Sequence, residues 1–238
     1  MKTKALILAG GMGTRLQPYT FFVPKPMLPL ADRPLLEHLI VWLKANKIDE
    51  IVISVSYLRH MIEDYFEDGK RWGLKIAYAT SDSPLGISGQ ILAGKSQINS
   101  TFVLLYGDSA FDFDLKRMQA FHKKSNAKLT IGLMHYSEKM KYGLIERDEK
   151  TGVVLSWKEK PEIGGLINVG CYIAEPTLFD YIPKGKMYGF DKVVRDMMNG
   201  GEKVVSYVIE GKEFNDIGDE KSYKKAYDLY MQKLGKIL

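Results

Sequence analysis

The residue types best suited to chemistry follow the first apolar run of the chain. The run from Lys4 to Ala9 passes into a glycine-rich stretch that also carries Thr14 and Arg15. Glycine leaves backbone N–H groups uncovered, so an anion can approach them closely. Arg15 and Lys25 add two cations to this segment, one as a planar fork and one as a point charge. The combination predicts a phosphate site and suits a triphosphate.

Two common phosphate-binding motifs do not fit this loop. A dinucleotide-binding G-x-G-x-x-G motif that begins at Gly11 would place its third glycine at Leu16. A P-loop would end in Gly-Lys followed by Ser or Thr, where this chain has Gly13-Thr14-Arg15. These differences exclude a nicotinamide dehydrogenase and a P-loop enzyme as interpretations.

The loop instead has the pattern GGxGTRLxPxT followed by PKPMLPL. This pattern resembles the nucleotide-binding loop of the sugar-1-phosphate nucleotidyltransferases, also called NDP-sugar pyrophosphorylases. The alternative, a tight turn with a surface lysine, does not account for so many matched positions. The resemblance implies catalytic roles for Arg15 and Lys25. It also implies a nucleotide-binding group made of Leu8, Ala9, Gly10, Gly11, Gly13, Thr14, Asp82, Gly86 and Ser88.

By the same resemblance, two carboxylates are expected to hold Mg²⁺. Asp108 follows a buried strand in the segment LLYGD, where Tyr106 replaces the asparagine that is common in the family. Asp216 stands in FNDIG, which is similar to a late segment of the family. Mg²⁺ is a hard cation that prefers carboxylate and phosphate oxygens. For Asp108 alone a turn residue would be a fair interpretation, and only the fold can bring the two carboxylates together.

The second half of the chain carries the motifs that the family uses for the sugar phosphate. WKEKP is similar to the family's E-K-P, and INVGCY is similar to its N-x-G-x-Y. A solvent-exposed charge pair would be the simpler interpretation of the E-K pair alone. The resemblance implies that a carboxylate and an amide bind sugar hydroxyls and that a lysine neutralises the sugar phosphate. The implied sugar-phosphate group is Gly143, Glu159, Lys160, Asn168 and Gly170.

The segment expected to bind the base departs from the family pattern. The family has P-L-G-T-A-G, whereas this chain has Ile87 and Ser88 after Gly86. Such a change could alter the base that is accepted. The motifs look most like those of mannose- or heptose-1-phosphate guanylyltransferases, and glucose-1-phosphate thymidylyl- or uridylyltransferases remain the alternative. No residue decides the base or the sugar by itself, because discrimination depends on the shape of the pocket.

Alternating apolar strands and amphipathic helices must position these residues. Strands are predicted at residues 4–9, 51–56, 74–79, 101–108 and 128–134, with helices at 34–46, from about 57 to 66, and near 115–124. A glycine-containing loop is expected between the strands at 74–79 and 101–108, and Asp32 is a candidate cap of the helix that starts at Pro34. This alternation indicates an α/β fold with a mainly parallel, mixed sheet. The resemblance implies a Rossmann-like, three-layer α/β/α nucleotidyltransferase fold.

The chain is expected to form a single domain of residues 1–238. Its nucleotide-binding half would span residues 1–140. Short strands after Tyr142 indicate a smaller α+β sugar-binding portion, residues 141–218, packed on the first half. A C-terminal helix would occupy residues 219–238, with Asp219 as its N-cap.

Composition limits the remaining classes. The net charge of +5 over 238 residues is compatible with anionic substrates and lies far from the charge of a nucleic-acid-binding protein. A single cysteine excludes an internal disulfide and suggests a cytoplasmic protein. Apolar runs are too short for a membrane span or a signal peptide. Dimers or tetramers are common in the family, although no segment identifies an interface.

The implied reaction joins an NTP to a sugar 1-phosphate and gives an NDP-sugar and pyrophosphate. The attacking sugar phosphate is already an anion, so no general base is required and catalysis should consist of positioning and charge neutralisation. A different class is a non-catalytic regulatory subunit that binds a sugar nucleotide. Binding alone would not require the full set of Arg15, Lys25, Asp108 and Asp216.

Overall fold

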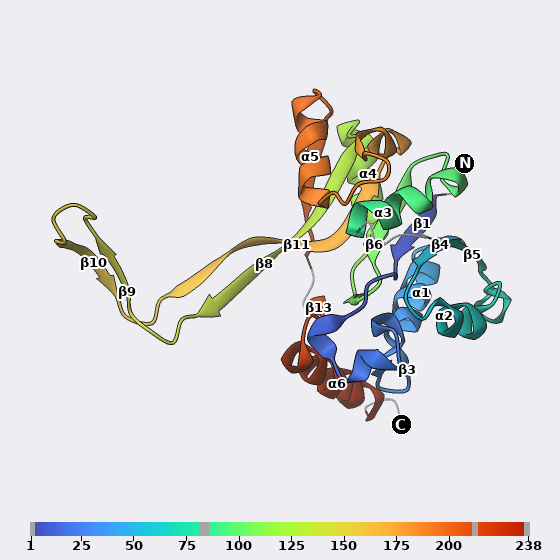
Figure 1. Cartoon of the computed structure of the whole chain (residues 1–238), viewed down its shortest axis with the longest axis horizontal. Coiled ribbons are helices and arrows are strands. Elements are labelled where there is room, and N and C mark those ends of the chain that lie inside the picture. The colour runs from blue at the N-terminus through green and yellow to red at the C-terminus, as the bar shows by residue number, and fades with distance from the viewer. Residues whose placement is uncertain (1–2, 81–85, 211–213, 236–238) are drawn as a thin grey trace.

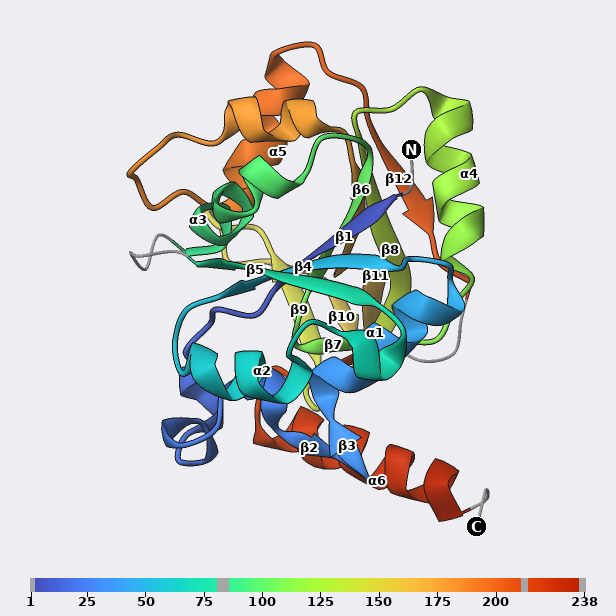
Figure 2. The same cartoon turned by 90° about the vertical axis from the view of Figure 1, so that its right-hand side faces the viewer.

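A mixed sheet forms the centre of the computed structural model, which describes residues 3–80, 86–210 and 214–235, with only the backbone for 214–216 (Figures 1 and 2). Among the described residues this sheet has seven strands in the order β12-β8-β11-β6-β1-β4-β5. Neighbouring strands are parallel except that β11 runs antiparallel to both β6 and β8. The strands are β1 (Lys4–Leu8), β4 (Glu50–Val55), β5 (Lys75–Thr80), β6 (Phe102–Tyr106), β8 (Leu129–Lys139), β11 (Glu162–Ala174) and β12 (Val204–Val208).

Helices cover both faces of this sheet, and β1 shows why. Its side chains alternate, so that Ala5 and Ile7 pack on one face while Leu6 and Leu8 pack on the other. The first core cluster takes side chains from α1 (Leu35–Ala45), α2 (Arg59–Phe66) and α4 (Leu115–Ser125). The second takes side chains from α3 (Gly86–Ala93), α5 (Phe190–Asn199) and the 3-10 helix η6 (Pro176–Tyr181). The predicted three-layer α/β/α architecture is confirmed.

A third, smaller core cluster fixes the C-terminal helix α6 (Glu220–Gly235). Ala226 packs with Leu16 and Leu30 there, and the hydroxyl of Tyr223 donates to the carbonyl of Pro29 at 2.8 Å. Asp219 accepts a hydrogen bond from the N–H of Ser222, as expected of an N-cap. The small strands near this cluster are β2 (Pro29–Leu30), β3 (Arg33–Pro34), β7 (Ser109–Phe111) and β13 (Phe214–Asp216).

The outer parts of β8 and β11 leave the body of the protein as an arm (Figure 1). The pairing of β8 with β12 ends at Leu133, and the pairing of β11 with β6 begins at Cys171. We call residues 134–167 the arm, because its two strands continue to pair with each other from Met134–Ile167 outward. The hairpin β9 (Leu144–Arg147) and β10 (Val154–Lys158) forms its end.

The arm differs from the expected sugar-binding portion. We expected residues 141–218 to pack on the first half as one unit, but β9 and β10 extend away from the sheet, whereas β11, α5 and β12 belong to the body. Because β11 and β12 pair within the main sheet, that sheet also crosses the expected division after residue 140.

Three other local predictions were incomplete. The segment that forms α3 was expected to be a loop, since Gly86 and Gly89 lower helix propensity. No helix or strand was assigned to α5 or β12. Asp32 was considered as a cap of α1, but it forms an ion pair with Arg33 and the helix begins after Pro34.

The remaining 3-10 helices are η1 (Thr14–Leu16), η2 (Tyr19–Phe21), η3 (Lys25–Met27), η4 (Lys70–Trp72) and η5 (Lys95–Gln97). The described helices include none with the length and apolar character to cross a membrane.

A β-bulge interrupts β11 where it enters the body. The register with β8 shifts between Asn168 and Tyr172. Gly170 within this bulge has φ +71°, and a Cβ there would lie 2.6 Å from Cδ2 of Tyr106. Only glycine fits this backbone conformation and this close approach.

We therefore expect Gly170→Ala to lower the free energy of unfolding by roughly 2–4 kcal/mol, the sum of left-handed backbone strain and overpacking. Gly165→Ala is the matched control, because it lies on the same strand and its added Cβ would have no atom within 4 Å. Denaturant unfolding of both variants measures the difference. Equal stabilities would contradict this account of the bulge.

A buried histidine makes stability depend on pH. His122 Nδ1 lies 2.7 Å from Oγ1 of Thr130, and Nε2 lies 3.3 Å from Oε1 of Glu175. Burial lowers the pKa of His122 below its ordinary value near 6.5. Between that lowered pKa and 6.5, the unfolded chain therefore binds a proton that the folded chain does not.

We expect the free energy of unfolding to decrease as the pH falls through about 6.5 and below. His122→Gln should make this decrease smaller without abolishing it, since burial also lowers the pKa of His38. Thermal or denaturant unfolding from pH 8 to pH 5 measures both profiles. An unchanged profile in His122→Gln would exclude His122 as a source of the pH dependence.

Candidate functional site

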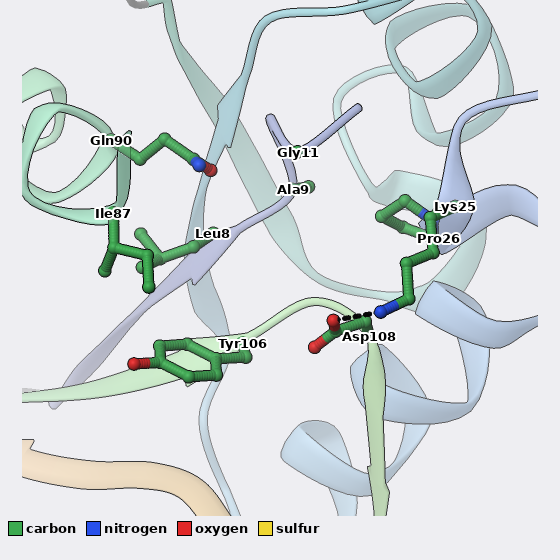
Figure 3. A pocket seen from close by; sticks show the side chains of 9 residues that line it. All are labelled: Leu8, Ala9, Gly11, Lys25, Pro26, Ile87, Gln90, Tyr106 and Asp108. Atoms are coloured by element: carbon green, nitrogen blue, oxygen red, sulfur yellow. Dashed lines mark hydrogen bonds and ion pairs between the residues drawn. The ribbon is translucent and has the colours of Figure 1, made fainter. Parts of the chain in front are cut away.

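The site lies where the order of the strands reverses. After β1 the chain adds β4 and β5 on one side of that strand and then places β6 on the other. In open α/β sheets, ligands bind at the carboxyl ends of the strands beside such a reversal. A cavity of about 150 Å³ opens there, between the ends of β1 and β6 (Figure 3). Its lining consists of Leu8, Ala9, Gly11, Lys25, Pro26, Ile87, Gln90, Tyr106 and Asp108.

A second cavity of about 220 Å³ adjoins the first and shares Gly11, Lys25 and Asp108 with it. It is lined by Gly11, Gly13, Thr14, Arg15, Leu16, Lys25, Asp108 and Gly218. The fold thus brings both predicted catalytic cations, the predicted metal ligand Asp108 and much of the predicted nucleotide-binding loop to one place.

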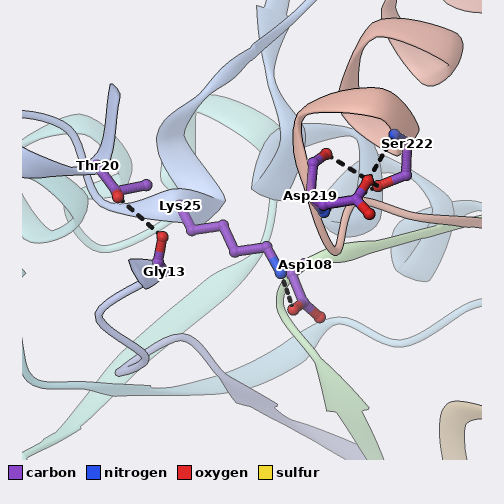
Figure 4. Close-up of polar contacts among 6 residues, drawn as sticks. All are labelled: Gly13, Thr20, Lys25, Asp108, Asp219 and Ser222. Carbon is purple, nitrogen blue, oxygen red and sulfur yellow. Dashed lines mark hydrogen bonds and ion pairs between the residues drawn. The ribbon is translucent and has the colours of Figure 1, made fainter. Parts of the chain in front are cut away.

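Local hydrogen bonds hold the glycine-rich loop in shape. Gly13 has φ +62°, and its carbonyl accepts a hydrogen bond of 2.9 Å from Oγ1 of Thr20 (Figure 4). The N–H of Gly10 donates to Oε1 of Gln90 at 2.8 Å. The short helix η1 then begins at Thr14 and carries Arg15. The loop is therefore connected to η2 on one side and to α3 on the other.

An ion pair between Lys25 and Asp108 joins this loop to the end of β6 (Figures 3 and 4). Lys25 lies in η3 between two prolines and is only 8% exposed. A charge buried to this extent needs a partner of opposite sign. The pair places a cation and a carboxylate on the shared wall of the two cavities.

Asp216, the second predicted metal ligand, lies beside this pair along the backbone. β13 runs antiparallel to β7, and its residue Asp216 is opposite Ser109, the residue after Asp108. The N–H of Ile217 donates to the carbonyl of Asp108 at 3.3 Å. The fold therefore brings together the two segments that carry the predicted carboxylates. Oxygen donors of this kind suit Mg²⁺, and the ligand roles stay a prediction.

Two residues of the predicted sugar-phosphate group stand behind one wall of the first cavity. Asn168 donates from Nδ2 to the hydroxyl of Tyr172 at 2.6 Å, and Tyr172 donates to the hydroxyl of Tyr106 at 3.2 Å. The N–H of Gly170 donates to Oδ1 of Asn168 at 3.1 Å. Burial raises the pKa of Tyr106, so its phenol is neutral near pH 7. Asn168 and Gly170 are thus connected by hydrogen bonds to Tyr106, which itself lines the cavity.

The other three members of that group lie on the arm where the β8–β11 ribbon meets the hairpin β9–β10, since Gly143 directly precedes β9 and Glu159 and Lys160 directly follow β10. Nε1 of Trp157 donates to Oε2 of Glu159 at 3.3 Å. An ideal Cβ at Gly143 would lie 3.0 Å from each of these two atoms. Lys160 follows Glu159 directly. Among the described residues that line either cavity, none of these three is present. Their sugar-phosphate role stays a prediction, and a single copy of the chain does not bring them to the cavities.

The segment expected to bind the base is described in part. Asp82 lies outside the described residues. Gly86 begins α3 with φ +68°, and Ser88 is buried in that helix with no hydrogen-bond partner for its Oγ among the described atoms. Their nucleotide-binding roles stay predictions.

Sequence reasoning missed four residues that line the first cavity as binding residues: Pro26, Ile87, Gln90 and Tyr106. Gln90 is the most consequential, because it holds the N–H of Gly10. It was missed because α3 was taken for a loop, and only Ile91 and Leu92 in that segment indicated otherwise.

Known proteins resemble this chain over nearly its whole length. It is 36% identical over 203 residues to a UTP–glucose-1-phosphate uridylyltransferase of Synechocystis, covering 78% of this chain and 52% of that protein. It is 35% identical to a mannose-1-phosphate guanylyltransferase of Mycobacterium tuberculosis, covering 93% of this chain and 63% of that protein. The chain thus spans about half to two thirds of the length of these curated relatives. The solved structure of HddC from Yersinia pseudotuberculosis, complexed with GMP-PN, is 26% identical and superimposes with a TM-score of 0.75, covering 96% of this chain and 99% of that one.

A family model agrees with these comparisons. The model described as "Nucleotidyl transferase" matches residues 4–233, which include the glycine-rich loop, the arm and most of α6. The resemblance drawn from the sequence motifs is confirmed at the level of the family. The chain belongs to the nucleotidyl transferase family.

Proposed function

We propose that this protein transfers NMP from an NTP to a sugar 1-phosphate and releases pyrophosphate. The observation that carries the proposal is the convergence of a glycine-rich loop, Arg15 and the Lys25–Asp108 pair on two adjoining cavities. A site with two cations and uncovered N–H groups suits a chain of phosphates.

The reaction needs no general base. A phosphate oxygen of the sugar 1-phosphate attacks the α-phosphorus in line, and the bond to the departing pyrophosphate breaks. Arg15 binds the β- and γ-phosphates and stabilises the charge that develops on pyrophosphate. Lys25 acts at the α-phosphate from its fixed position beside Asp108. Both contributions are electrostatic and preorganised by the fold.

We propose that Asp108 and Asp216 hold Mg²⁺. The ion would neutralise phosphate charge during the transfer. In support, the two segments that carry these residues are adjacent along the backbone of β7 and β13. Asp108 also lines both cavities, beside the cations proposed to bind the phosphates.

The proposed substrates are GTP and mannose 1-phosphate or a related sugar phosphate, and the alternative is glucose 1-phosphate with dTTP or UTP. The guanylyltransferase and uridylyltransferase among the relatives support both choices. We further propose that the protein acts in the cytoplasm, in keeping with its single, buried cysteine, Cys171.

Pyrophosphate release tests the reaction. With Mg²⁺ present, GTP, UTP, dTTP, CTP and ATP are each combined with mannose, glucose and N-acetylglucosamine 1-phosphates. We expect pyrophosphate only when a nucleotide and a sugar phosphate are both present, and most with GTP and mannose 1-phosphate. If no pair reacts while the folded protein still binds a nucleotide, the regulatory interpretation would replace the enzyme.

Removal of a phosphate-binding cation tests the roles within the site. We expect Arg15→Ala to lower kcat by about 10²–10³, as for the loss of one preorganised donor, with thermal stability unchanged. Arg117→Ala is the matched control, because Arg117 lies on α4 with its side chain 72% exposed. Near wild-type turnover in Arg15→Ala would exclude the proposed role.

The proposed metal site has its own test. Asp108→Asn should lower turnover by a comparable factor and weaken the dependence on Mg²⁺ concentration. Steady-state rates across a magnesium titration measure both effects. A titration identical to that of the wild type would exclude Asp108 as a metal ligand.

A further inference from the structure

The arm exposes an amount of apolar surface that is unusual for two strands. Trp157 is 66% exposed, Leu155 61% and Tyr142 75%. The other exposed large apolar residues of the arm are Tyr136, Leu144, Ile145, Val153, Val154, Ile163 and Leu166. A two-stranded ribbon is only marginally stable by itself, and contiguous exposed apolar surface marks an interaction site. The arm therefore resembles a protein interaction surface.

A groove lies along the β8–β11 part of the arm, from Tyr136 to Tyr142. It has a volume of about 550 Å³. Tyr136, Met140, Tyr142, Ile163 and Ile167 supply its apolar lining. A concave apolar lining of this kind accommodates protruding apolar side chains from a partner.

The rim of the candidate active site carries such side chains. Met187 is 74% exposed and Met12 58%. Met12 lies within the glycine-rich loop, and Met187 packs within reach of Gly86 at the start of α3. Ile87 lines the first cavity and is itself exposed. The chain thus has two separate apolar surfaces, one on the arm and one around the mouth of the site.

The distribution of charge also supports contact between the arm and the mouth of the site. Among the described residues that line the two cavities, the cationic side chains are Arg15 and Lys25, and the proposed mechanism assigns both to the phosphates of the NTP. An NTP and a sugar 1-phosphate together bring several negative charges to this place. The arm carries Lys158 at the end of β10, followed directly by Glu159 and Lys160, two of the residues predicted to bind the sugar phosphate. Among the described residues that line the cavities, no further cationic side chain remains for the phosphate of the sugar substrate, whereas the arm carries Lys158 and Lys160.

We infer that a second copy of this chain places its arm across the mouth of this active site, with the base of the hairpin β9–β10 over the cavities, and that the exchange is reciprocal. Lys160 of each arm then meets the sugar phosphate bound to the other copy. In a two-fold exchange, the arm surface and the mouth surface of each copy are both covered by the other copy. Because such an interface is closed, the dimer does not extend into a larger assembly. The strand pairing of β8 with β11 remains intact, since the arm does not have to fold back on its own body. The inference rests on the proposed function for the substrate that Lys160 meets.

Mixing two inactive variants tests the exchange. Arg15→Ala damages the body of the site, and Lys160→Ala damages the arm. In a mixed dimer, one site combines an intact body with an intact arm. After joint unfolding and refolding at equal amounts, we expect about a quarter of the wild-type activity, because half of the dimers are mixed and one of their two sites is intact.

Two controls accompany this experiment. Arg15→Ala mixed with Asp108→Asn should recover nothing, because both changes lie in the body. Lys150→Ala, at the exposed turn of the arm, should keep full activity and shows that arm substitutions alone do no harm. No recovery in the Arg15→Ala and Lys160→Ala mixture, with both variants dimeric, would overturn the exchange.

A second measurement does not depend on any substrate. Sedimentation should find a dimer, and acrylamide should quench the fluorescence of Trp157 poorly in that dimer and well after dilution into monomers. The difference between wild type and Trp157→Phe isolates this signal from Trp42 and Trp72. Leu155→Glu should shift the protein toward monomer without unfolding it.

The two measurements separate the possible failures. A dimer with a shielded Trp157 but no turnover on any substrate pair would support the exchange and contradict the proposed function. A monomer with full turnover and an accessible Trp157 would contradict the exchange and leave the proposed function standing.

Discussion

The parallel pairing of β1 with β6 is the constraint on which the site depends. These two strands lie at the centre of the sheet and are buried on both faces, so their relative position is fixed by packing from two sides. Their ends deliver the glycine-rich loop and Asp108 to the same point. A shift of either strand by one residue would turn its core side chains to the wrong face. The geometry of the site is therefore as stable as the core itself.

Charge placement follows from this frame. Burial of Lys25 forces it to pair with Asp108, and the pair in turn joins the loop to the strand end. Such an arrangement holds a cation and a carboxylate ready before any substrate arrives, so little reorganisation is required when phosphates bind. The hydrogen-bond chain from Asn168 through Tyr172 to Tyr106 stiffens the neighbouring wall in the same way.

Much of the body could be predicted from sequence, because its signals are local. Continuous apolar runs identified β1, β4 and β6, and the spacing of apolar residues identified α1 and α4. The glycine-rich loop and its cations were found from residue types alone. The helix α3 was missed because its glycines obscure its propensity, and with it the contact of Gln90 to Gly10. The arm was missed because a strand that leaves a sheet has the same composition as one that stays, and only the partners of β8 and β11 distinguish the two.

The position of β11 has a consequence for how the chain is made. This strand lies between β6 and β8, both of which precede it in sequence, and it runs antiparallel to both. Until residue 174 has left the ribosome, the edge of β6 and the edge of β8 that pair with β11 both lack their partner. Unpaired edges of this kind are templates for association with other chains. A nascent chain that stalls before β11 is complete would thus have a four-stranded sheet with an open edge at β6 and an unpaired strand β8, because β12 follows β11 in sequence. The completion of β11 is therefore the step that joins β8 to the sheet and covers the exposed edge of β6.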